Sequence, residues 1–361
     1  MTARIPATMR AAVLTGHGGP ERLEVRDDVA VPTPGPGEAL IRVVACGVNN
    51  TDINTRVGWY GRRDGNGIAD STWGDPTSMF PRIQGADPCG TVVAVGGAPD
   101  EGIRHDLVGR RVVVDPIIRD PADPSNRDTA GYLGSELDGG FAEYCVVPTV
   151  NVYEVPRTVD VSDVELAGLG CSWSAAHHML DRAAVGAGHR VVVTGASGGV
   201  GSALVRLASL RGAEVTAIAA TSKHVDVATL GAVHLVPRDA DDVVAAAVAA
   251  AGGASDVVAD VVGGTEVNRW LGSLRRGGRY VTAGAIGGAI AQIDLRVLYL
   301  NDLQLHGATV FEPRIFAELV ALVTTGVVRP RVAATFPLEE IQAAQAAFER
   351  KEHAGKIVIT I

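Results

Sequence analysis

A glycine-rich turn between a strand and a helix is the feature that most restricts the fold of this chain. Residues 191–201 read Val-Val-Val-Thr-Gly-Ala-Ser-Gly-Gly-Val-Gly. Glycine lets the backbone approach a pyrophosphate closely, and the N-terminus of the following helix offers free N–H groups and a partial positive charge. A tight turn without a ligand is the alternative. The turn predicts a nucleotide site with contacts from Gly195, Ser197, Gly198, Gly199, Val200 and Gly201.

The residues after this turn continue as alternating strands and helices, which indicates βαβ units and a parallel sheet. Residues 9–150 instead form short Val- and Ile-rich segments broken by Gly and Pro, which favours an all-β region. Strands are expected at 38–44, 90–95, 111–114, 142–147, 190–193, 214–218, 233–235, 256–261, 279–283 and 356–361. Helices are expected at 200–210, 224–230, 241–251, 267–274, 313–325 and 338–351.

The fold class is therefore α/β with two domains, since 361 residues exceed one ordinary core. We expect a β-rich domain from residues 1–155. Residues 156–304 are expected to form a Rossmann domain with a doubly wound parallel sheet.

Composition excludes several classes of protein. The net charge is −9 and the basic residues are scattered, so no nucleic-acid partner is expected. No apolar run reaches the ~20 residues that span a bilayer, so no membrane partner is expected. The first ten residues lack the apolar core of a secretory leader, which makes the cytoplasm the expected compartment. The remaining partner is a small-molecule substrate.

The type of nucleotide is predicted from charge at the end of the second strand of this domain. An NAD site usually places an acid there for the ribose hydroxyls, and residues 217–224 contain none. Lys223, one of the three lysines with Lys351 and Lys356, supplies positive charge, and Ser222 supplies a hydroxyl. We expect NADPH rather than NADH, with Lys223 holding the 2′-phosphate; a solvated surface lysine is the alternative.

Further cofactor contacts are expected where later strands of the parallel sheet end, because ligands lie at the carboxyl ends of such strands. Val262 follows the strand at 256–261, and Gly284, Ala285 and Ile286 follow the strand at 279–283.

Several segments together resemble the medium-chain dehydrogenase/reductase superfamily. They are Gly47-Val48-Asn49, Gly139–Tyr144, Gly195–Gly201, Asp256–Gly264, Gly277–Arg279 and Gly355–Ile359. The resemblance covers nearly the whole chain. It implies that the β-rich domain is GroES-like and is the catalytic or substrate domain, and that residues 305–361 return to it. It also implies that a homodimer forms through sheet edges of the Rossmann domain.

The zinc alcohol dehydrogenases of this superfamily hold a catalytic metal with Cys, His and Cys. The resemblance puts these positions on Asn49, Ala86 and Cys171. Asparagine is a poor zinc ligand and alanine is none, so we expect no metal. A degenerate site from Asp87, Cys171 and a water is the alternative. No C-x-x-C pair is present for a structural zinc.

The zinc-free branch, which contains the quinone oxidoreductases and enoyl reductases, fits better. Residues 49–60 read Asn-Asn-Thr-Asp-Ile-Asn-Thr-Arg-Val-Gly-Trp-Tyr and are similar to the enoyl reductase segment Asn-Pro-Ser-Asp-Ile-Asn followed by Gly-x-Tyr. The resemblance implies that Tyr60 donates a proton after hydride addition and that Asn49 contacts cofactor and substrate. Thr51 would orient the same groups.

Structural alternatives exist for each of these residues. Tyr60 could pack as a loop aromatic beside Trp59, Thr51 could cap a helix that starts at Asp52, and Asn49 could bond the backbone of a turn. Asp52 and Asp87 are expected to orient loops. Arg62 and Arg63 could attract an anionic substrate or form a solvated loop.

The sequence predicts an NADPH-dependent reductase of conjugated C=C bonds or quinones. Hydride addition to an enone builds charge on a carbonyl oxygen, which hydrogen-bond donors can stabilise without a metal. The alternatives are an alcohol dehydrogenase or ketone reductase with a degenerate zinc site, and an NADPH-binding sensor without turnover.

Overall fold

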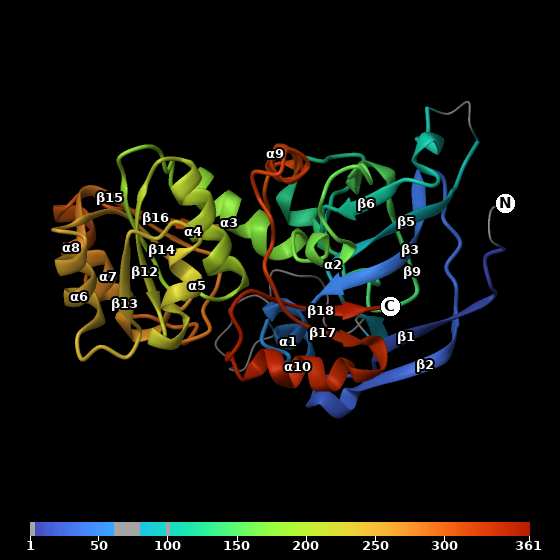
Figure 1. The fold of residues 1–361 in the computed structure, drawn as a ribbon, viewed down its shortest axis with the longest axis horizontal. Coiled ribbons are helices and arrows are strands. Elements are labelled where there is room, and N and C mark those ends of the chain that lie inside the picture. The colour runs from blue at the N-terminus through green and yellow to red at the C-terminus, as the bar shows by residue number, and fades with distance from the viewer. Residues whose placement is uncertain (1–3, 61–79, 99–101) are drawn as a thin grey trace. The chain divides into compact units, whose positions relative to one another are not determined.

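A computed structural model describes residues 4–60, 80–98 and 102–361, and they form two compact units (Figure 1). Unit 1 contains Met1–Cys171 and Glu312–Ile361, and unit 2 contains Ser172–Phe311. The α/β class and the return of the chain end to the first unit agree with the sequence. The boundaries differ from the expected 155/156 and 304/305. Strand β16 (Gln304–Gly307) pairs with β15 (Leu274–Thr282), and this hydrogen bonding keeps the residues after 304 in unit 2.

Unit 1 is built mainly from a seven-stranded sheet. Its strand order is β10-β6-β5-β3-β18-β17, and β9 also pairs with β3. The strands are β3 (Glu38–Gly47), β5 (Asp87–Val95), β6 (Arg111–Val114), β9 (Tyr144–Pro148), β10 (Val152–Glu154), β17 (Val332–Pro337) and β18 (Lys356–Thr360). Smaller sheets are formed by β2 (Leu23–Ala30), β1 (Thr8–Leu14) and β4 (Arg82–Ile83), and by β7 (Ile117–Ile118) and β8 (Gly131–Tyr132).

The last strand of the chain determines the position of the site in unit 1. Strand β18 runs antiparallel to β3, with Val358 opposite Gly47, and the N–H of Val48 donates to the carbonyl of Ile357 at 2.9 Å. This register carries Lys356 to the carboxyl end of β3, where α1 (Asn50–Val57) begins. Residues separated by some three hundred positions in the sequence therefore become neighbours.

The helices of unit 1 cover its sheets through apolar stripes. In α9 (Pro313–Thr324) the buried residues recur at helical spacing from Ile315 to Val323. In α10 (Ile341–Glu349) the buried side chains include Ile341 and Phe348, which join the core around β1 and β3. The short α2 (Asp163–Leu166) starts with a capping box in which Ser162 and Glu165 bond reciprocally.

Unit 2 is a six-stranded parallel sheet with the order β13-β12-β11-β14-β15-β16. Read from the first strand of the unit, this is the order 3-2-1-4-5-6 of the dinucleotide-binding fold. The other strands are β11 (Arg190–Val193), β12 (Glu214–Ala219), β13 (His234–Pro237) and β14 (Ser255–Asp260). The helices are α3 (Gly170–Arg182, whose first two residues fall in unit 1), α4 (Gly199–Leu210), α5 (His224–Ala228), α6 (Val243–Ala250), α7 (Val267–Gly272) and α8 (Leu295–Leu300).

One structural alternative that the sequence left open is wrong. The helix considered to start at Asp52 with Thr51 as its cap begins at Asn50 instead, and Asn49 precedes it in extended conformation. The carboxylate of Asp52 accepts a hydrogen bond from the N–H of Asn49 at 2.7 Å, which fixes the helix start two residues earlier than a cap at Thr51 would. Thr51 is therefore an internal residue of α1.

Candidate functional site

The glycine turn of unit 2 has the geometry of a phosphate-binding loop. Gly195 has a φ of +57°, in the left-handed region that favours glycine. A Cβ on Gly201 would lie 2.0 Å from the carbonyl oxygen of Gly195, so a side chain there would push helix and turn apart. Gly198 precedes the first turn of α4, and a Cβ there would meet only ordinary contact at 3.5 Å. The first N–H groups of α4, from Gly199 to Gly201, have no intrahelical acceptors, as at any helix start.

Lys223 lies in the segment where the 2′-phosphate is expected. It belongs to a short 3-10 helix, Thr221–Lys223, that follows the carboxyl end of β12. Its side chain is only 9% exposed, so the alternative of a freely solvated lysine does not describe it. Ser222 is exposed beside it. The phosphate contact itself stays a prediction.

A buried aspartate, which no local pattern in the sequence indicates, holds the other loops that are predicted to contact the cofactor. Asp260, at the end of β14, accepts hydrogen bonds from the hydroxyls of Thr194 and Tyr280. It also accepts from the N–H of Val262 at 2.8 Å and from that of Gly263 at 3.1 Å. These bonds tie the glycine turn, β15 and the predicted contact Val262 to one carboxylate.

The same network reaches the loop after β15. The N–H of Gly287 donates to the carbonyl of Val262 at 2.7 Å, which holds the segment that contains Gly284, Ala285 and Ile286. Ile286 is 53% exposed. The predicted contacts after β14 and β15 are thus brought together at the carboxyl ends of neighbouring strands, as expected from the fold.

Unit 1 contains a buried cluster of charged and polar side chains around Lys356. The ammonium Nζ of Lys356 lies 3.0 Å from Oδ2 of Asp87 and also donates to Oδ1 of Asn49. The side chains of Lys356 and Asp87 are 2% and 0% exposed, so this ion pair is fully withdrawn from water. The amide of Asn49 returns a hydrogen bond to Asp87 at 2.9 Å, and the N–H of Cys171 donates to the other oxygen of Asp87 at 2.6 Å.

Asp52 lies next to this cluster and supports the start of α1. It accepts from the backbone of Asn49, and its own carbonyl accepts from Nε2 of Gln84 at 2.7 Å. Burial, and to a smaller extent the nearby Asp87, raise the pKa of Asp52 to about 7. Both aspartates hold backbone segments in place, as the sequence suggested.

Tyr60 and Thr51 are brought together, and Asn49 is not part of their contact. The hydroxyl of Tyr60 accepts from Nδ2 of Asn54 at 3.2 Å and donates to Oγ1 of Thr51 at 3.4 Å. Burial raises the pKa of Tyr60, and the two hydrogen bonds counter part of that effect. Asn49 is 3% exposed, with both ends of its amide engaged by Lys356 and Asp87. Arg62 and Arg63 lie outside the described residues.

The residues at the three zinc-ligand positions do not fit a zinc ion. The amide oxygen of Asn49 already accepts from an ammonium, and Ala86 offers no donor atom. Burial and the neighbouring Asp87 raise the pKa of the Cys171 thiol to about 12. Within the described ranges, no group of three or more His, Cys, Asp or Glu side chains has a metal-binding arrangement. The degenerate site of Asp87 and Cys171 is opposed by the Lys356 charge, which repels a second cation.

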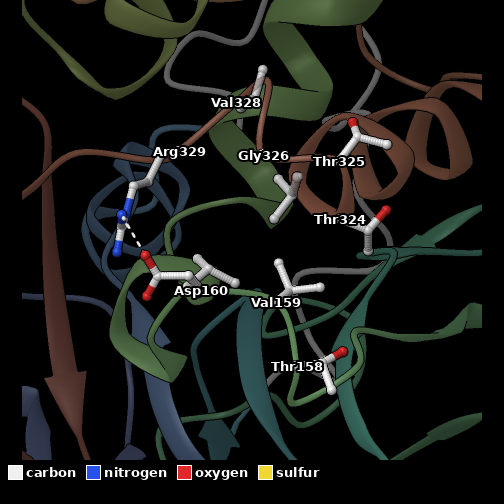
Figure 2. Close-up of a pocket in the computed structure, with 10 residues that line it drawn as sticks. Thr158, Val159, Asp160, Thr324, Thr325, Gly326, Val328 and Arg329 are labelled. Carbon is white, nitrogen blue, oxygen red and sulfur yellow. Dashed lines mark ion pairs between the residues drawn. The ribbon is translucent and has the colours of Figure 1, made fainter.

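A separate surface cavity of about 470 Å³ in unit 1 contains none of the predicted site residues. It lies between residues 158–161 and the end of α9 (Figure 2). Its one basic group, Arg329, is paired with Asp160 at 3.6 Å and also with Glu165. The cavity lacks candidate catalytic groups.

Comparisons with known proteins place the chain in a family. Residues 35–157 match the alcohol dehydrogenase GroES-like domain, and residues 230–359 match the zinc-binding dehydrogenase family. Together the two matches cover parts of both units. The chain belongs to the medium-chain dehydrogenase/reductase superfamily, and it is an oxidoreductase of that superfamily. A pyridine nucleotide is the cofactor expected for the family.

Three relatives illustrate the range of activities in this family. A crystal structure from Sinorhizobium meliloti 1021, provisionally assigned as an alcohol dehydrogenase, is 44% identical, with a TM-score of 0.90 over 99% of this chain and 97% of that one. The quinone oxidoreductase of Pongo abelii is 28% identical over 92% of both chains. The NAD-dependent alcohol dehydrogenase of Sulfolobus acidocaldarius is 28% identical over 98% of this chain and 100% of its own length.

In the part of the chain that the structure describes, no helix has the length and apolarity needed to cross a membrane.

Proposed function

We propose that the protein is an NADPH-dependent reductase that transfers hydride to a conjugated C=C bond or a quinone without a catalytic metal. The observation that carries the proposal is the Lys356 ammonium, which bonds Asn49, one of the three positions that the resemblance assigns to zinc ligands, and Asp87, the neighbour of another. A buried cation already neutralised by Asp87 cannot polarise a carbonyl as an open-sided Zn²⁺ does. The negative charge that develops during the reaction must then be stabilised by hydrogen-bond donors of the protein.

Reduction of an enone meets that condition. Hydride arrives at the β-carbon, and the negative charge spreads over the enolate instead of remaining on one alkoxide oxygen. A phenol can then give its proton to the α-carbon. Tyr60 is the candidate acid because its hydroxyl is half-buried and held by Asn54 and Thr51. We assign Asn49 a positioning role, since its amide is occupied by Lys356 and Asp87.

NADPH is supported by the charge near the end of β12. Residues 217–224 contain no acid, and Lys223 is held with little exposure beside an exposed Ser222. A 2′-phosphate is stabilised by such a cation and would be repelled by the acid usual in NAD sites.

A homodimer is the proposed assembly. Strand β16 is the edge strand of the unit 2 sheet, and Leu305 on it is 41% exposed. Leu295, Tyr299 and Leu300 of α8 are 65%, 63% and 56% exposed. An open edge with apolar neighbours is a site for pairing with a second chain. Sedimentation of the purified protein should give a dimer mass, and Leu305→Lys should give a monomer.

An alcohol dehydrogenase is the second candidate, because the 44% identical relative carries that assignment. One assay separates the two. Loss of reduced-nicotinamide absorbance is followed with an enone, a quinone, an enoyl thioester and a simple ketone, and the reverse reaction with a primary and a secondary alcohol. The proposal requires turnover of a conjugated substrate or quinone. Turnover confined to ketones and alcohols would establish the second candidate, and binding of NADPH without turnover would indicate a sensor.

A further inference from the structure

A continuous row of hydrogen bonds in unit 1 ends at the hydroxyl of Tyr60. Nζ of Lys351 donates to Oδ1 of Asn50 at 3.2 Å, and Nδ2 of Asn50 donates to Oδ1 of Asn54 at 3.3 Å. Nδ2 of Asn54 donates to Tyr60 at 3.2 Å, and the Tyr60 hydroxyl donates to Thr51 at 3.4 Å. The first three donors therefore point from the lysine toward the phenol.

Local structure explains why these groups meet. Asn50 and Asn54 are four residues apart in α1, so they share one face of the helix. Lys351 follows α10 with a φ of +55°, in the left-handed region, and its ammonium lies 3.7 Å over the ring of Phe348. The turn and the ring hold the ammonium near the first turn of α1.

The lysine fixes the direction of the row. An ammonium can only donate, so Asn50 must present its oxygen to Lys351 and its amino group to Asn54. Asn54 must then present its oxygen to Asn50 and its amino group to Tyr60. Without a donor-only group at the start, the two amides could both reverse, and Asn54 would offer Tyr60 an acceptor in place of a donor.

We propose that Lys351, Asn50 and Asn54 are positioning residues that act through this row to stabilise the phenolate of Tyr60. The inference rests on the proposed function only where it gives the Tyr60 phenolate a role in catalysis. In the reaction, the O–H bond of Tyr60 breaks and a C–H bond forms at the α-carbon of the enolate, and solvent later returns the proton to the phenolate. Hydrogen bonds to a charged oxygen are stronger than those to a neutral one, and aligned donors reinforce each other.

Burial and nearby charged groups shift the pKa values of Tyr60 and Lys351. Burial raises the pKa of Tyr60, and Cys171 and Asp52 act in the same direction when ionised. Burial lowers the pKa of Lys351 to about 8, and Glu349 opposes this shift. His353 packs on the ring of Phe348, and the neighbouring Arg350 and Glu352 pair with each other at 3.6 Å.

The direct test is the pKa of Tyr60 itself, measured by NMR on the full-length protein with ¹³Cζ-labelled tyrosine; Tyr60→Phe assigns the signal. Lys351→Met and Asn54→Leu should each raise this pKa by about one unit, since each weakens a donor to a charged oxygen. Lys351→Arg keeps a donor-only cation and should leave the pKa near that of the unaltered protein. Arg350→Met removes an exposed neighbouring charge outside the row and should also change little.

An unchanged Tyr60 pKa in Asn54→Leu, or an equal rise in Arg350→Met, would overturn the proposal. Asn54→Leu is also the variant to use if Lys351→Met does not fold. Kinetics separate this outcome from failure of the proposed function. If Tyr60 is the acid, Lys351→Met lowers kcat about 10-fold with little change in KM, and it has no further effect in a Tyr60→Phe background. If Tyr60→Phe keeps full turnover, the proposed acid is wrong, while the NMR result still decides whether the row exists.

Discussion

The nucleotide turn of unit 2 and the lysine cluster of unit 1 are built in opposite ways. The turn uses backbone atoms from eleven consecutive residues, 191–201, and needs glycine because Gly195 has a positive φ and Gly201 touches backbone. The cluster uses side chains from separate segments, and Lys356 reaches Asn49 and Asp87 across 307 and 269 positions. The first site depends on local conformation, whereas the second depends on strand pairing and on charge balance within a buried space.

The largest expected effect is in the cluster. Lys356→Met leaves the Asp87 carboxylate buried without its cation, which should lower the free energy of unfolding by about 3–5 kcal/mol. Denaturant unfolding of the purified variant measures this change. The double variant Lys356→Met/Asp87→Asn removes both charges and should recover much of the loss. Similar stability of the single and double variants would show that the ion pair is not what holds the cluster together.

The second effect is a pH dependence of stability that comes from Asp52, next to the cluster. The pKa of Asp52 rises from 3.8 to about 7 on folding, so the folded protein binds more protons than the unfolded chain between these values. The free energy of unfolding should therefore fall as pH increases from about 4 to about 7, by on the order of 2–4 kcal/mol. Subtracting the unfolding curve of Asp52→Asn isolates this slope, and a pH-independent difference would contradict it.

A third effect distinguishes two glycines of the turn. Gly201→Ala should cost about 1–3 kcal/mol of stability, because the new Cβ lies 2.0 Å from a carbonyl oxygen. Gly198→Ala meets only ordinary contacts, so it should keep its stability and weaken NADPH binding. Gly272→Ala, with open space around it, is the control for both. Thermal unfolding measures the stability of each variant, and nucleotide titration measures its NADPH affinity. An equal loss of stability in the variants at 198 and 201 would be inconsistent with the turn geometry.

The smallest effect concerns the choice of nucleotide. Lys223→Glu should raise the KM for NADPH about 10-fold or more, since it replaces a charge-assisted hydrogen bond by repulsion. The KM for NADH should change much less. Steady-state kinetics with both nucleotides give the ratio of the two KM values. Equal changes in both would show that Lys223 does not contact the 2′-phosphate.

The same contrast explains what the sequence could predict. Strands at 111–114 and 190–193 were predicted with the observed bounds. A run of β-branched residues between turn residues is enough to indicate where such a strand begins and ends. The cap at Asn49 and the domain boundary near 311 were missed, since they depend on Asp52 and on β16 pairing with β15. Asp260 was inside a quoted segment, but nothing local indicated that Thr194 and Tyr280 would converge on it.

The three lysines show most clearly which roles could not be predicted from the sequence. All three were visible in the sequence, and charge reasoning selected Lys223 because it lies a predictable distance after the glycines. Lys356 and Lys351 gained their roles only from the antiparallel pairing of β18 with β3 and from the turn after α10. The family resemblance identified the zinc positions, and the structure added the cation that lies among them.

Metal content measured together with activity tests the central claim most directly. The purified protein is analysed for zinc by elemental mass spectrometry, and NADPH oxidation with an enone is followed before and after exhaustive treatment with a chelator. The account predicts far less than one zinc per chain and an unchanged rate. One zinc per chain, with activity lost on its removal and restored by its return, would contradict it.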